Sequence, residues 1–184
     1  MLTTAQKTTL KNAINADAAL APFVAIADWP AIAIELNKLA SPAFPMWRSD
    51  APVQSIYDAI TWTNYTPVDT PDLTATFTNR VLVIQTKQMN LQNILQGRSS
   101  IDAGKANVRA GLRDAVVGLP AGVAGASVSA GGASGVTVLT ACTRSGLYIE
   151  KILAGASATT GTVTANVLAW EGQIEYGDVQ AAMV

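Results

Sequence analysis

The sequence predicts a mainly α-helical fold, a helical bundle that carries a β-hairpin near its C-terminus. Apolar residues recur at three- and four-residue spacing through much of the chain, as in helices with one buried face. Residues that cap helices precede several of these stripes. A period of two is found only in the last part of the chain, where two short alternating runs flank Glu171-Gly172.

The first two helices are predicted from their capping residues. Thr3 and Gln6 form a capping box before an apolar stripe, so we expect a helix over Thr3–Leu20. Asp28 is expected to cap a second helix, which has Pro30 in its first turn and ends by Ser41-Pro42. The prolines that follow favour an extended connector, because a residue before proline avoids the helical region.

Three more helices are expected in the middle of the chain. A short one begins near Asp50-Ala-Pro52. Residues Thr74–Thr86 are rich in β-branched side chains and could form a strand, but the apolar pattern continues to a glycine stop at Gly97, which favours a long helix. Ser100 is expected to cap the next helix, which ends at Gly118 and Pro120.

The last third of the chain is expected to contain a loop, a helix and the hairpin. Residues 118–135 are rich in Gly, Ala and Ser and lack anchoring apolar side chains, so neighbouring subunits are expected to order them. Val138 to Leu153 follows helical spacing and places Cys142 on a buried face. The hairpin is expected to pair Thr162–Trp170 with Gln173–Tyr176. The expected organisation is a helical domain (1–117), the loop (118–135), and a helix plus hairpin (136–184) that packs on the same domain.

Composition indicates a structural protein with covered surfaces. Of 184 residues, 14% are charged, against about a quarter in typical soluble domains. A surface so poor in charge is a hint of oligomer contacts. The formal net charge of −1 provides no global basic field for binding nucleic acid without sequence preference.

Catalytic and metal chemistry are not expected. The chain has no histidine and a single cysteine, Cys142, so the commonest general base and the commonest metal ligand are missing. We expect no enzyme activity, no catalytic residue, no metal and no cofactor. No secretory signal is visible at the start, and the uncharged stretch Ala115–Thr143 has too many glycines and too few large apolar residues for a membrane span.

Charge is segregated along the chain. Lys105, Arg109 and Arg113 are spaced by four, so they are expected to stack on one helix face. This basic face could be solvated, could meet acids of a neighbouring copy, or could touch phosphates of packaged DNA. The candidate acids lie in 50–72 and in the C-terminal part. Reversing Arg109 to Glu is expected to impair assembly and to leave the subunit folded.

Tryptophans complete the candidate interface. Several of the four lie in or beside loops, where they could close the core over helix ends or could anchor a partner, because aromatic residues are enriched at interfaces. The residues predicted for the interface are Lys105, Arg109, Arg113, Trp47, Trp170, Glu171, Glu175 and Asp178.

Two stretches carry a family resemblance. Ser41-Pro-Ala-Phe-Pro-Met-Trp-Arg48 and the C-terminal part, with Glu150-Lys-Ile-Leu-Ala-Gly155 and Leu168 to Gly172, resemble motifs of small uncharacterised structural and neck-region proteins of tailed bacteriophages. The start of the chain, Leu2-Thr-Thr-Ala-Gln6, fits the same pattern. These motifs carry no assigned chemistry, so no catalytic residue follows from them.

The resemblance implies a virion protein that is assembled in the cytoplasm of a bacterial host. The expected function is that of a head–tail connector or neck (adaptor) protein, a homo-oligomeric ring that contacts portal or tail components. The alternatives are a capsid decoration protein, a tail-tip protein and a DNA-packaging accessory that binds DNA.

Overall fold

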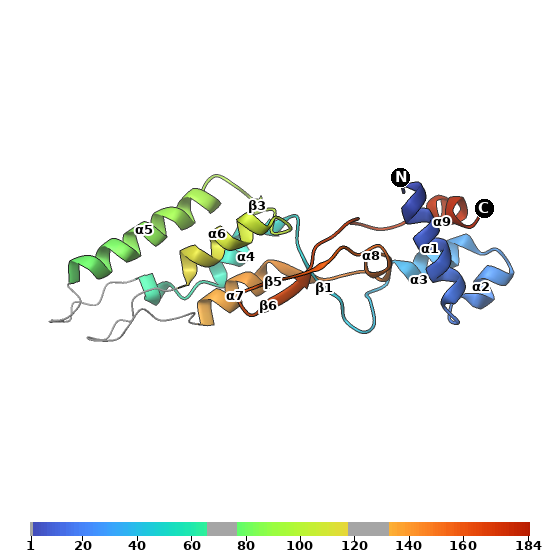
Figure 1. Ribbon diagram of the computed structural model, residues 1–184, viewed down its shortest axis with the longest axis horizontal. Helices are drawn as coiled ribbons and strands as arrows, with labels where there is room; N and C mark the ends of the chain where they lie inside the picture. Colours follow the sequence, from blue (N-terminus) through green and yellow to red (C-terminus); the bar gives the residue numbers. More distant parts are fainter. Residues whose placement is uncertain (1, 66–76, 118–132) are drawn as a thin grey trace. The chain divides into compact units, whose positions relative to one another are not determined.

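The protein has a mixed α/β fold. The computed structural model describes residues 2–65, 77–117 and 133–184 (Figure 1). Helices alternate with short strands, four of which form a mixed sheet, so the predicted mainly α-helical bundle is wrong. The strands are only two to four residues long, and except for the last two they pair with segments distant in sequence, so local periodicity gives no sign of most of them.

The chain divides into two compact units, each built from separate stretches. Unit 1 comprises Met1–Met46, Ser145–Ala158 and Ala165–Val184, and unit 2 comprises Trp47–Arg144 and Thr159–Thr164. The expected division at 117 and 136 stays a prediction, because residues 118–132 lie outside the described part. The expected ordering of the loop 118–135 by neighbours falls mostly on the same residues.

Unit 1 is a helical cluster that joins the two ends of the chain. The capping box of Thr3 and Gln6 is confirmed at the start of its first helix, and Asp28 caps the third through the N–H of Ala31. The first and third helices pack on the last, which buries Val179 completely. Its helices are α1 (Thr4–Ala16), α2 (Ala21–Ala25), α3 (Trp29–Leu36), α8 (Tyr148–Ile152) and α9 (Tyr176–Met183).

Polar contacts fix the C-terminal segment within unit 1. The side chain of Asn37 donates to the carbonyl of Ile174 and accepts from its N–H, both at 2.9 Å. The fully buried carboxylate of Glu150 accepts from the N–H groups of Leu147, at 2.8 Å, and Gly172, at 3.0 Å. These bonds satisfy backbone groups in a stretch that has no regular structure of its own.

In unit 2 the longest of the described helices runs beside the next helix in the chain (Figure 1). The predicted helix ending at Gly97 is confirmed over residues 77–95, and Gly97 has the positive φ of 73° that favours glycine. Residues 74–76 lie outside the described part. The elements of unit 2 are β2 (Ala51–Pro52), α4 (Val53–Asp58), the 3₁₀ helix η1 (Trp62–Tyr65), α5 (Phe77–Leu95), β3 (Ser100–Ile101), α6 (Ala106–Val116) and α7 (Ala133–Ala141).

Two small sheets contain the strands. The four-stranded sheet has the order β4 (Thr143–Ser145), β1 (Pro45–Trp47), β6 (Val163–Asn166) and β5 (Ser157–Thr160). Strands β1 and β6 are parallel, with Met46 opposite Asn166. Strands β2 and β3 pair in antiparallel orientation, with Ala51 opposite Ile101.

The predicted hairpin is displaced along the chain. Neighbouring strands β5 and β6 are joined at Gly161-Thr162 rather than at Glu171-Gly172, and Gly161 has a φ of 60°. Threonines 159 and 164 share a hydrogen bond of 3.1 Å between these strands. The β-branched residues on both sides of Gly161 favour strands there, and Gly161 permits the turn between them. Tyr176, expected in the second strand, begins α9.

Several predicted helices have different bounds. The first ends at Ala16 rather than at Leu20, and α4 begins at Val53, after strand β2. Ser100, the expected cap, is paired in β3, and α6 begins at Ala106 after a turn in which Asp102 Oδ1 accepts the N–H of Gly104 at 2.9 Å. The expected helix from Val138 to Leu153 is interrupted by β4 and Gly146. An ideal Cβ on Gly146 would lie 2.5 Å from Met46 Sδ, so the chain passes too close for a side chain there.

Two further expectations concern Cys142 and the membrane. Cys142 has no exposed surface, which confirms its predicted burial. No helix in residues 2–65, 77–117 and 133–184 is long and apolar enough to cross a membrane. Much of the uncharged stretch 115–143 lies outside these ranges.

Candidate functional site

The predicted basic face on α6 separates into residues with different environments. Lys105 is the N-cap residue of α6 and is exposed, and its Nζ lies 3.5 Å from Asp102 Oδ2. Arg113 is half-buried, with Nε 3.2 Å from the position of an ideal Cβ on Gly161. The common spacing of these residues therefore does not give them a common exposure.

Arg109 is a buried structural residue with only 4% of its surface exposed. Its Nη1 donates to the carbonyl oxygens of Ala103 and Gly104, each at 2.7 Å, and its Nε donates to Thr160 Oγ1 at 3.3 Å. Burial lowers the pKa of the guanidinium below its usual value, and the Asp102 carboxylate opposes this effect. Its Nε and Nη1 donors are bonded within unit 2, and the buried side chain presents little charge to a partner.

The two predicted tryptophans are also part of the interior. Trp47 is 1% exposed and lies in unit 2, where its ring faces the guanidinium of Arg109. Trp170 is half-buried and packs against the core of unit 1. Packing within the two units is therefore sufficient to explain why tryptophan occurs at both positions.

The predicted acidic residues differ in accessibility. Glu171 and Glu175 are exposed, and Asp178 is half-buried in the first turn of α9. In the acidic stretch 50–72, Asp50 is ion-paired with Arg48 at 3.1 Å, and Asp58 accepts from Gln54. Asp69 and Asp72 lie outside the described residues. Glu175, the exposed residue directly before α9, is therefore the more available candidate for a contact.

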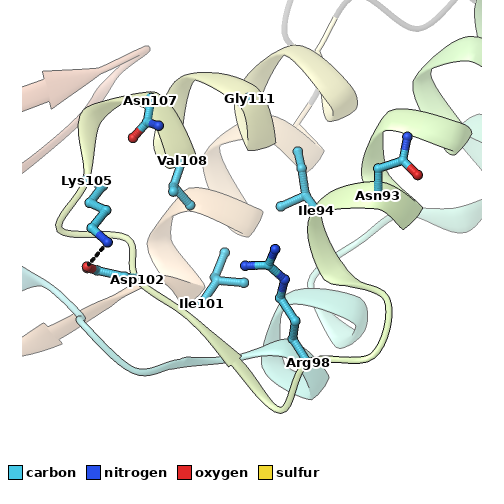
Figure 2. Close-up of a pocket in the computed structure, with 9 residues that line it drawn as sticks. All are labelled: Asn93, Ile94, Arg98, Ile101, Asp102, Lys105, Asn107, Val108 and Gly111. Atoms are coloured by element: carbon cyan, nitrogen blue, oxygen red, sulfur yellow. Dashed lines mark ion pairs between the residues drawn. The ribbon is translucent and has the colours of Figure 1, made fainter.

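A pocket of about 310 Å³ lies where α5, β3 and α6 meet (Figure 2). Its apolar floor comes from Ile94, Ile101 and Val108, and α5 approaches α6 closely at Gly111, where an ideal Cβ would lie 3.4 Å from Ile94 Cδ1. The nine lining residues are Asn93, Ile94, Arg98, Ile101, Asp102, Lys105, Asn107, Val108 and Gly111.

Hydrogen-bond donors surround this floor. The exposed Arg98 side chain extends from the turn after α5 toward the middle of the pocket, while Lys105 and Asp102 pair at its edge (Figure 2). No residue of the described ranges accepts a hydrogen bond from the Arg98 guanidinium. The exposed amides of Asn93 and Asn107 add further donors. The pocket is suited to a ligand that combines a negative charge with an apolar body.

Sequence reasoning found Lys105 and missed the rest of this pocket. Arg98 follows Gly97 in a turn, so helical spacing does not connect it with Lys105. The signal available in the sequence was the run of basic residues from Arg80 to Arg113, which contains both.

Two kinds of reactive group, a metal cluster and an activated thiol, are absent from the described residues. Across the described ranges no three Asp, Glu, Cys or His side chains are grouped so as to hold a metal ion. The fully buried thiol of Cys142 has its pKa raised to about 12 by burial, which opposes formation of a nucleophilic thiolate. Comparison of the chain with protein-family models, with curated proteins and with solved structures gives no match.

Proposed function

We propose that this chain is a non-enzymatic structural protein of a tailed-bacteriophage virion, a head–tail connector or neck protein that assembles as a homo-oligomeric ring. Assembly in the host cytoplasm and contacts with portal or tail components belong to the same proposal. Its supports are the resemblance at both ends of the chain, the low charge content, and the exposed face of α5.

The exposed face of α5 is the observation that carries the assembly role. Leu82 and Met89 lie two turns apart on this face and are 54% and 60% exposed. Thr86 and Asn93 continue the same line, and no residue from 81 to 95 is charged except the half-buried Lys87, whose Nζ donates to the carbonyl of Asp114. A long helix with this composition is unusual on a surface that stays in water, since exposed helix faces normally carry charges.

A charge placed on this face tests the assembly role. Leu82→Glu and Met89→Glu should each prevent oligomers, because a carboxylate would lose its hydration in the contact. Leu82→Gln and Met89→Gln are matched neutral controls and should retain more assembly. Mass photometry and negative-stain electron microscopy report the oligomer, and circular dichroism reports the fold. Unchanged assembly of both Glu variants would contradict the use of this face.

Particle composition tests the virion role. Mass spectrometry of purified particles should detect the chain in a fixed copy number, and particles assembled without it should lack stable head–tail joining. Joined, infectious particles without the chain would contradict a connector role, and its absence from all particles would contradict a virion role.

A DNA-packaging accessory is the second candidate, favoured by the exposed cations Arg98 and Lys105. DNA affinity that falls steeply with salt would support it, since each neutralised phosphate releases counterions. Weak DNA binding without a salt slope, together with ring formation, would favour the connector.

A further inference from the structure

We infer that the α5–β3–α6 pocket receives Glu175 and Tyr176 of a second copy of this chain, so that copies associate head to tail. This inference rests on the proposed ring and names its contact. The pocket lies in unit 2, and Glu175 and Tyr176 lie in unit 1. Each copy therefore carries one pocket and one segment that can enter the pocket of another copy.

The charge of the pocket fits a single carboxylate. Arg98 and Lys105 provide two positive charges, and Asp102 removes one of them. Asn93 and Asn107 lie on opposite sides of the pocket (Figure 2) and add uncharged donors at its rim. A nucleic-acid backbone would bring several phosphates toward Asp102, whereas one carboxylate can sit at Arg98 without approaching it closely. The charge pattern therefore favours a protein side chain over DNA.

The apolar floor fits an aromatic neighbour of that carboxylate. Ile94, Ile101 and Val108 offer aliphatic surface between the donors (Figure 2). A ring packed on this surface would remove apolar area from water while its hydroxyl stayed at the rim. The occupant should thus present an acid and an aromatic residue next to each other on an exposed, structured segment.

Glu175 and Tyr176 meet this description. Tyr176 is 60% exposed as the first residue of α9, and Glu175 is the exposed N-cap residue before it. Within the described ranges the Glu175 carboxylate has no hydrogen-bond or ion-pair partner. The acid–aromatic pair Tyr57 and Asp58 is less available, because Asp58 already accepts a hydrogen bond from Gln54 at 2.8 Å.

Such a contact is heterologous and gives a ring when the rotation between copies closes. Asn93 belongs both to the pocket and to the exposed face of α5, so the pocket and this helix face form one continuous patch. The charges set the register of neighbouring copies, and the apolar surfaces supply most of the affinity.

A charge swap tests this contact. Arg98→Glu and Glu175→Arg should each weaken self-association at least tenfold at low salt, and the double variant should recover most of it. Lys7→Glu, a reversal on α1 in unit 1, is the control and should associate like the parent. The readouts are mass photometry for association and circular dichroism for folding.

Mixed disulfides test the geometry and do not depend on charge reversal. Asn107→Cys and Tyr176→Cys proteins should form cross-linked dimers under mild oxidation when mixed, and neither should do so alone, because the contact joins two different surfaces. Buried Cys142 should not react. A mixture of Thr8→Cys with Asn107→Cys is the control and should stay uncross-linked.

Several outcomes would overturn the inference. If both charge variants associate like the parent while Leu82→Glu does not, assembly stands and this contact is wrong. If each cysteine variant cross-links with itself, the contact is symmetric and the head-to-tail arrangement fails. If Arg98→Glu loses affinity only for a double-stranded DNA oligonucleotide, the pocket binds phosphate. A parent protein that is monomeric both alone and in particles contradicts the proposed function itself.

Discussion

The guanidinium carbon of Arg109 lies 4.9 Å from the centroid of the Trp47 ring, and both side chains are buried in unit 2. A desolvated cation over an indole face contributes about 2 kcal/mol. The same guanidinium bonds the carbonyls of Ala103 and Gly104, which lie in the turn before α6. The pair therefore links β1, the turn and α6, and both residues serve the fold rather than an exposed interface.

Because Arg109 is buried and not on an exposed face, Arg109→Glu should unfold or strongly destabilise the protein, instead of leaving the subunit folded as the spacing alone led us to expect. A carboxylate at this position would face two carbonyl oxygens and leave a buried charge unpaired, which costs about 3–5 kcal/mol. Lys105→Glu, on the same helix but exposed, should change the free energy of unfolding by less than about 1 kcal/mol. Urea unfolding followed by circular dichroism measures both. Equal stability of the two variants would mean that Arg109 is solvated.

Glu150→Ala should destabilise unit 1 because it removes the acceptor of two backbone N–H groups. The N–H groups of Leu147 and Gly172 would be left unpaired, each at a cost of about 1–3 kcal/mol. Glu150→Gln retains one acceptor oxygen and should therefore lose less stability than Glu150→Ala. Thermal unfolding of the three proteins gives the ranking, and a Gln variant less stable than the Ala variant would contradict this account.

Gly155→Ala and Gly177→Ala should change stability in opposite directions. A Cβ on Gly155 would collide with the carbonyl oxygen of Val167, whereas a Cβ on Gly177, in the first turn of α9, would meet nothing within 4 Å. Gly155→Ala should lower the melting temperature by several degrees. Gly177→Ala should raise the free energy of unfolding by about 0.5–1 kcal/mol, because Ala loses less backbone entropy in a helix. Differential scanning calorimetry separates the two.

Cys142 should react with a thiol reagent only after unfolding. Its side chain is fully buried, its Sγ donates to the Val138 carbonyl at 3.4 Å, and its pKa is raised to about 12. At pH 8 the native thiol should react more than about a thousandfold slower than a peptide thiol, which has a pKa near 8.5. With a reagent that releases a coloured thiolate, absorbance measures the rate of Cys142 labelling with and without urea. Fast labelling of the native protein would show that α7 opens.

Tyr65 should make stability fall at alkaline pH. Burial raises the pKa of its phenol from 10.0 to about 12, and its hydroxyl donates to the Ala115 carbonyl at 2.8 Å. The folded state holds this proton more tightly, so the stabilisation is complete below pH 10 and is lost as pH rises toward 12. At pH 8 the free energy of unfolding of Tyr65→Phe should be about 1 kcal/mol lower than that of the parent. Between pH 10 and 11.5 this free energy should fall less in the variant than in the parent.

Urea unfolding at several pH values measures the Tyr65 effect. Tyr176→Phe alters an exposed phenol and serves as the control for general alkaline effects. If the free energy of unfolding of the parent and of Tyr65→Phe falls in the same way as pH rises, a group other than Tyr65 causes the fall.

Local signals in the sequence were sufficient for the helix starts near the N-terminus. Thr3 bonds Gln6 three residues away, and Asp28 bonds Ala31, so neither cap depends on distant parts of the chain. The interruption at Gly146 could not be predicted in this way. It depends on Phe44 and Met46, which are far away in sequence and occupy the space of a side chain. Position 161 shows an intermediate case, in which a visible turn signal competed with a similar one at Glu171-Gly172.

The candidate site was predictable only in part for a related reason. Spacing placed Lys105 and Arg109 on one helix, and this is confirmed except that Lys105 is the N-cap residue. Spacing could not reveal that Trp47 and Thr160 enclose Arg109, whereas Lys105 stays in solvent. Exposure depends on the chain that packs over a helix, and Arg98 joins the pocket through such packing alone.

The packing of α1 against α9 sets the earliest time at which unit 1 can fold during synthesis. The ribosome delivers α9 only after the whole stretch between Ala16 and Tyr176 has followed α1, and Val179 completes a core that Leu10 and Ile14 begin. At typical elongation rates the N-terminal helices wait on the order of ten seconds for their partner. During that interval their apolar faces are open to chaperones and to other nascent chains on the same messenger. Truncated translation products should therefore bind holdase chaperones until the last helix has emerged.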